Sequence, residues 1–100
     1  RTASYAKDDW AVIGREVDDI YAGFVELMTA GTPAASGAAA DLVDRHRAHI
    51  TRWFYDCTPE IHAGLGQMYL SDPRFAENID KAGTGLASYL SEAIADRYAD

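Results

Sequence analysis

Cys57 and the three histidines are the residues of this sequence best suited to chemistry, and all four lie between positions 46 and 62. A thiol just before a helix start, here Thr58 and Pro59, can have its thiolate favoured by exposed amide groups. A cysteine hydrolase also needs an oriented histidine base and an oxyanion hole, and no nucleophile motif accompanies His49 or His62. We therefore expect no enzyme, and interpret Cys57 as a small buried side chain with a reactive thiol as the alternative.

His46, His49 and His62 also raise the question of a metal or haem site. His46 and His49 are three residues apart and share one face of a predicted helix, but no third ligand follows at a spacing typical of metal sites. A mostly uncharged imidazole can both donate and accept hydrogen bonds. We expect structural or ligand-contacting histidines, with no metal and no cofactor, and keep a haem or metal protein as the third alternative.

Aromatic side chains crowd the same stretch and could line a pocket for a planar ligand. Trp53, and after it Trp10, are the better candidates for such a wall. Aromatic residues at helical spacing usually pack in a core, and packing is our interpretation of Phe24, Phe54, Phe75 and Tyr89.

The junction that follows Trp53 offers polar anchors and more apolar wall. Asp56 and Glu60 flank Cys57 there, either as contacts for a ligand or as caps on a solvated surface. The next helix repeats large side chains at helical spacing, namely Ile61, His62, Leu65, Met68 and Tyr69. This spacing predicts a mostly apolar hollow at the junction.

The first two helices are indicated by apolar side chains repeating every three or four residues. One helix is expected from about Lys7 to Ala30, where residues 31–33 stop it. After a small-residue connector at 33–40, a second helix capped by Ser36 is expected to end near Tyr55.

Three further helices complete the prediction. Thr58 and Pro59 begin a helix that ends near Leu70, and a short helix follows Pro73 and carries Phe75 and Ile79. Gly83 ends that helix, and Thr84 caps the last one. Without strand alternation or a long linker, the sequence predicts an all-α single domain of about five helices over residues 1–100.

Composition limits the class of partner. The 100 residues are 48% hydrophobic and 25% charged, which is typical of a folded helical domain. A net charge of −7 would repel DNA and an anionic membrane surface, so we expect neither as a direct partner. One cysteine, no signal peptide and no long apolar run favour a cytoplasmic protein.

The sequence resembles the antibiotic-recognition or effector domain of thiostrepton-induced proteins, the TipAS family attached to MerR-type transcriptional regulators. The resemblance covers nearly the whole chain. It is carried by Thr2–Tyr5, Asp9, Trp10, Phe24–Met28, His46, Arg47, Tyr55–Cys57, Leu65, Met68, Tyr69, Arg74, Phe75, Asn78–Asp80 and Gly85–Ala87.

This resemblance implies a globin-like helical fold and a cleft for bulky hydrophobic thiopeptide antibiotics such as thiostrepton. Such a domain would sense the drug for a transcriptional activator, or sequester it as a resistance protein. We expect the cleft at Trp10, His46, Trp53, Asp56, Cys57, Ile61, His62, Gly64 and Met68. The alternative is a helical dimerisation or docking module of a regulator that does not bind drugs.

Two departures from the family are visible. A second cysteine of the best-known member, which forms a thioether with a dehydroalanine of the antibiotic, corresponds to Gly64 here, so reversible binding is expected. The family also has a segment upstream of the position matching Thr2 that folds over the ligand, and this sequence does not include it. Because the sequence starts at Arg1, we expect it to be a piece of a longer regulator, with any DNA-binding domain upstream.

Overall fold

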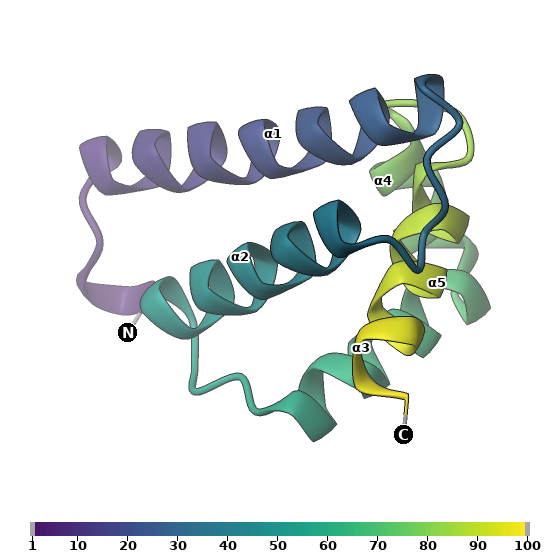
Figure 1. Ribbon diagram of the computed structural model, residues 1–100. Coiled ribbons are helices and arrows are strands. Elements are labelled where there is room, and N and C mark those ends of the chain that lie inside the picture. The colour runs from purple at the N-terminus through teal and green to yellow at the C-terminus, as the bar shows by residue number, and fades with distance from the viewer. Residues whose placement is uncertain (1, 100) are drawn as a thin grey trace.

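The computed structural model describes residues 2–99, and within them every regular element is a helix (Figure 1). The elements are η1 Thr2–Ser4, α1 Lys7–Thr29, α2 Gly37–Trp53, α3 Pro59–Ser71, α4 Pro73–Asp80 and α5 Leu86–Tyr98. The predicted all-α class with five main helices is confirmed. None of the helices in this part of the chain is long and apolar enough to cross a membrane.

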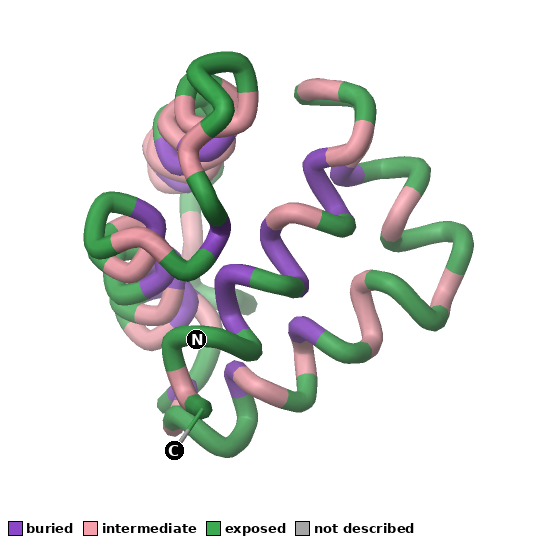
Figure 2. Tube along the Cα trace, turned by 45° about the vertical axis from the view of Figure 1, so that its right-hand side comes forward, coloured by how far each residue is buried: buried purple, intermediate pink, exposed green. Residues whose placement is uncertain are grey.

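α5 holds the molecule together because it contacts α1, α2, α3 and α4. α1 and α2 lie side by side, and α3 packs mainly on α5 and α4 (Figure 1). Figure 2 shows the buried positions on the sides of the helices that face one another. The fully buried side chains of this core include Phe24, Val43, Leu86, Leu90 and Ile94.

α3 approaches α5 closely at a glycine. A Cβ atom built on Gly66 would lie 2.9 Å from Cγ2 of Ile94, closer than real Cβ contacts come. The missing side chain therefore lets α3 rest directly on α5. Another side of α3, which carries Leu65, Met68 and Tyr69, faces α1 and α2.

Three predicted helix boundaries are confirmed, two by cap hydrogen bonds and one by a backbone angle. The Ser36 hydroxyl accepts from the backbone amide of Ala39 at 3.2 Å, and the Thr58 hydroxyl accepts from Ile61 at the same distance. α1 ends as expected, because Gly31 adopts a φ of 74°, a left-handed conformation that glycine accepts without strain.

The predicted end of α2 is close to the observed one, and the predicted cap of α5 is wrong. α2 ends at Trp53, two residues before Tyr55, because the chain leaves the helix at Phe54. Thr84 does not cap α5; the residue before the helix is Gly85, with a φ of 88°. The capping acceptor is instead the carboxylate of Asp80, which accepts from the backbone amides of Gly85 at 3.3 Å and Ala87 at 2.8 Å.

This cap generates a prediction about stability. Replacing Asp80 with alanine leaves two amides at the start of α5 without their acceptor. We expect D80A to lower the free energy of unfolding by about 1–2 kcal/mol, as measured by urea denaturation followed by circular dichroism.

E77A is the matched control, since Glu77 is an exposed carboxylate on the same helix, α4. Its effect should stay within about 0.5 kcal/mol. Equal losses in D80A and E77A would contradict the assignment of Asp80 as the cap.

Candidate functional site

A cavity of about 340 Å³ opens between α1, α2 and α3 and is closed at one side by the start of α4. Its volume lies within the usual range for small-molecule sites. The walls are mostly apolar and aromatic, and consist of Ile13, Val17, His46, His49, Ile50, Phe54, Tyr55, Leu65, Met68, Tyr69 and Phe75.

The packing of α3 explains why the space is open. Gly66 seats one side of α3 against α5, and Leu65, Met68 and Tyr69 line the cavity from the same helix. Tyr69 lies between His46, at a ring-centroid distance of 6.3 Å, and Phe75, at 6.1 Å. Burial, the strongest cause, raises the pKa of Tyr69, so its phenol is uncharged at neutral pH.

The rim of the cavity contains exposed aromatic side chains. Tyr55 is 42% exposed and Phe75 is 39% exposed, although both contribute to the wall. Large apolar side chains left in water beside a concave apolar surface are typical of a binding site. The site can therefore take a flat, largely apolar ligand, or one such part of a larger ligand.

A buried chain of hydrogen bonds runs from His46 on α2 to α5. His46 Nδ1 lies 2.8 Å from His62 Nε2, and His62 Nδ1 lies 2.7 Å from the hydroxyl of Tyr98. Burial lowers the pKa of His46 to about 3 and that of His62 to about 4. Both imidazoles are therefore neutral at pH 7.

Glu16 on α1 binds the third histidine, His49, and two further side chains of α2. Its carboxylate accepts from His49 Nδ1 at 2.9 Å, from Trp53 Nε1 at 3.0 Å and from Arg52 at 3.2 Å. The hydrogen bond from His49 is the main cause that lowers the pKa of Glu16, followed by the one from Trp53. Because a carboxylate only accepts, His49 carries a proton on Nδ1.

Of the residues expected at the cleft, His46 and Met68 line the cavity, and His62 lies behind His46. Trp53 is buried with its indole turned to Glu16. Cys57 is also buried, and burial raises the pKa of its thiol, so it is a poor nucleophile.

The remaining four expected residues are exposed and outside the cavity lining. Trp10 makes an edge contact with Tyr5 at 5.7 Å. Asp56 lies in the loop between α2 and α3, and Ile61 and Gly64 lie on the outer side of α3. A Cβ atom at Gly64 would meet no atom within 4 Å, so this position faces open space.

The sequence interpretation missed part of the wall. The helical spacing of Phe54 and Phe75 predicts packing in the core, but both line the cavity. Glu16 was not singled out, because its partners are more than 30 residues away along the chain. Helical spacing places Ile13 and Val17 on one face of α1, but it does not distinguish a filled interior from an open one.

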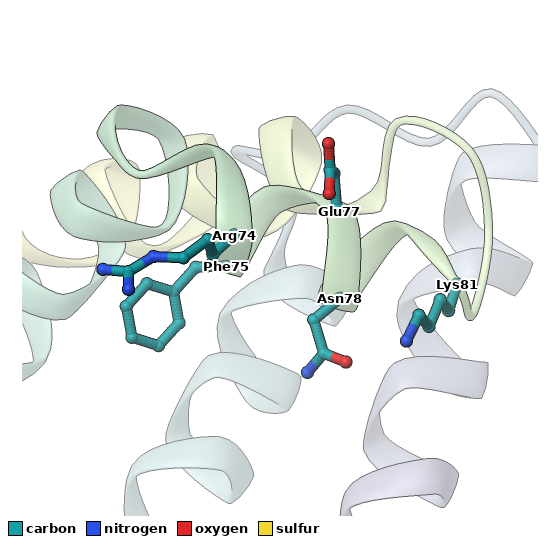
Figure 3. A pocket seen from close by; sticks show the side chains of 5 residues that line it. All are labelled: Arg74, Phe75, Glu77, Asn78 and Lys81. Carbon is teal, nitrogen blue, oxygen red and sulfur yellow. The ribbon is translucent and has the colours of Figure 1, made fainter.

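A second hollow lies on α4 and differs in chemistry. It is lined by Arg74, Phe75, Glu77, Asn78 and Lys81, and Figure 3 shows Glu77 pointing away from Phe75 and Asn78. Side chains from one helix and the residue after it form an open surface that cannot enclose a ligand. The cavity between α1, α2 and α3 is therefore the candidate site.

The histidines make no metal site with their neighbours. Among residues 2–99, no group of three or more histidine, cysteine, aspartate or glutamate side chains is arranged to hold a metal ion. Instead, His46 and His62 use ring nitrogens to bind each other.

Comparison with curated proteins finds transcriptional regulators. The chain is 51% identical over 94 residues to the HTH-type transcriptional activator TipA of Streptomyces lividans. This alignment covers 94% of the chain and 37% of TipA. It is 44% identical to the HTH-type transcriptional activator mta of Bacillus subtilis, over 94% of this chain and 36% of mta. The chain thus spans little more than a third of these relatives.

Solved structures of antibiotic-binding domains also match the chain. TipAS from Streptomyces lividans in complex with nosiheptide matches with a TM-score of 0.91 and 50% identity, over 96% of this chain and 67% of that one. The antibiotic-binding domain of a TipA-class multidrug resistance regulator matches with a TM-score of 0.78 and 48% identity, over 85% of this chain and 90% of that one. The sequence model of the TipAS antibiotic-recognition domain family matches residues 1–96, and the chain belongs to this family.

Proposed function

We propose that this domain binds thiopeptide antibiotics such as nosiheptide in the cavity between α1, α2 and α3. The observation that carries the proposal is the open apolar cavity in a chain half identical to a nosiheptide-binding relative. Apolar walls supply binding energy by removing ligand surface from water, and the two histidines supply polar contacts. Binding alone is sufficient for this function, and no reaction is required.

The domain would serve as the drug sensor of a longer MerR-type regulator acting in the cytoplasm. Its relatives are HTH-type activators of which it spans little more than a third. The net charge of −7 makes this part unsuited to DNA, so contact with DNA would fall to a fused domain. Activation requires that the drug bind two states of the regulator with different affinity, and a domain made alone would sequester the drug.

The alternative of a dimerisation or docking module has less support. That alternative expects Trp53 to become buried between two chains, but Trp53 is 8% exposed within this chain. Its indole already donates to Glu16 on α1. Trp53 therefore has little surface left to contribute to an interface.

The wall of the cavity provides the first test. Nosiheptide should raise the melting temperature, because a ligand that binds the native state stabilises it. Truncating Met68, which lines the cavity, removes apolar contact with the drug. We expect M68A to weaken the affinity for nosiheptide by about tenfold in isothermal titration calorimetry.

M28A is the matched control. Met28 is also half-buried, but it packs against the core near Gly85 and not against the cavity. M28A should keep the affinity of the wild type for nosiheptide. The proposal fails if saturating nosiheptide leaves the melting temperature of the wild type unchanged, or if both variants bind equally well.

Binding is expected to be reversible. Gly64 has no nucleophile, although the resemblance places a thioether-forming cysteine of the family at this position. Cys57 is fully buried, and the raised pKa of its thiol disfavours the reactive thiolate. Neither position can capture a dehydroalanine in the native protein.

A cysteine at position 64 tests this view. Gly64 is exposed, and a Cβ atom there meets nothing within 4 Å, so G64C should fold. Because Gly64 lies outside the cavity lining, capture requires that the bound drug extend beyond the cavity over the outer side of α3. Its thiol would add across the double bond of a thiostrepton dehydroalanine, with sulfur joining one carbon and the proton the other. Denaturing mass spectrometry should then find the summed mass of G64C and thiostrepton.

G64A serves as the control, because it also replaces the glycine with a residue that has a Cβ atom but carries no thiol. The wild type and G64A should release the drug on denaturation. An adduct in the wild type would disprove reversible binding. A folded G64C that gains no mass would place Gly64 away from the bound drug.

A further inference from the structure

The buried chain from Tyr98 through His62 to His46 has an end at the cavity. His46 is 3% exposed and lines the cavity, while His62 is fully buried behind it. His46 Nδ1 faces His62 at 2.8 Å, and no buried side-chain nitrogen or oxygen within residues 2–99 lacks a hydrogen-bond partner. The other ring nitrogen, Nε2, is therefore the polar atom of His46 that remains open to a ligand.

Each of the two imidazoles in this series of hydrogen bonds, His46 and His62, has one donor and one acceptor. Burial keeps His46 and His62 neutral, since their pKa values fall to about 3 and about 4. Burial also raises the pKa of Tyr98, so its hydroxyl keeps its proton. A neutral imidazole carries its proton on one nitrogen only, so the direction of one hydrogen bond sets the direction of the next.

The phenol sets that direction. A phenol hydroxyl is a much stronger acid than a neutral imidazole N–H, so Tyr98 donates and His62 Nδ1 accepts, and their 2.7 Å separation is typical of an O–H donor. His62 must then carry its proton on Nε2 and donate to Nδ1 of His46. His46, in turn, carries its proton on Nε2.

We propose that Tyr98, acting through His62, fixes the Nε2–H form of His46, so that the cavity offers one N–H donor to a hydrogen-bond acceptor of the antibiotic. The acceptor would be a carbonyl oxygen or the unprotonated nitrogen of a heterocycle. A ligand presenting a donor there would leave two buried donors facing each other without a partner. The inference rests on the proposed function for its ligand, while the tautomer is a property of the free protein.

The tautomer can be measured without any ligand. Long-range proton–nitrogen NMR spectra of ¹⁵N-histidine-labelled protein at pH 7 distinguish protonated from bare ring nitrogens. His46 and His62 should both be protonated on Nε2. His49, whose Nδ1 faces the Glu16 carboxylate, is the internal reference with a proton on Nδ1. A proton on Nδ1 of His46 would overturn the proposal.

Y98F removes only the hydroxyl that sets the direction. The variant should shift His46 towards a mixture of the two tautomers. Y89F is the matched control. Tyr89 is also on α5, but its hydroxyl donates to the carbonyl of Thr32 at 2.8 Å and takes no part in the hydrogen bonds between Tyr98, His62 and His46. Y89F should leave the histidine spectra unchanged. Identical His46 spectra in Y98F and the wild type would show that Tyr98 does not set the tautomer.

Affinity for nosiheptide gives the second readout. If Y98F leaves half of the molecules with the correct tautomer, its dissociation constant should rise about twofold, while Y89F binds like the wild type. H46F, which has no donor, should bind about fivefold more weakly. H46F binding as tightly as the wild type would overturn the role of the N–H donor. Failure of the wild type to bind would instead count against the proposed function, and the spectra would still decide the tautomer.

Discussion

The hydrogen bond between His46 and His62 joins α2 to α3 beneath a space that side chains do not fill. A buried neutral imidazole without a partner would cost free energy, so the pair and the hydroxyl of Tyr98 satisfy one another. Elsewhere α3 rests mainly on α5 and α4. This hydrogen bond therefore fixes the position of α3 relative to α2 and leaves the apolar cavity between them open.

The helices could be predicted because their signals are local. Ser36 and Thr58 cap the helices that follow them, and Gly31 ends α1, as their types and positions indicate. The start of α5 could not be predicted in the same way. Its cap is the carboxylate of Asp80, which reaches forward across a loop to the amide of Ala87.

The site was only partly accessible from the sequence. Helical spacing and residue type pointed to His46 and Met68, which line the cavity. The same reasoning could not tell that Trp53 turns inward to Glu16, or that Phe75 faces a cavity, because both depend on how distant helices pack. Family resemblance indicates the kind of ligand that we propose, whereas the direction that we propose for the buried hydrogen bonds depends on coordinates.

The central claim is that the antibiotic occupies the cavity between α1, α2 and α3, and methyl NMR tests it most directly. Protein with ¹³C-labelled methyl groups would be titrated with nosiheptide. We predict that the largest shift changes occur at the methyl groups lining the cavity, those of Ile13, Val17, Ile50, Leu65 and Met68. Unchanged signals from these groups, together with shifts at the exposed Ile61 alone, would contradict the account.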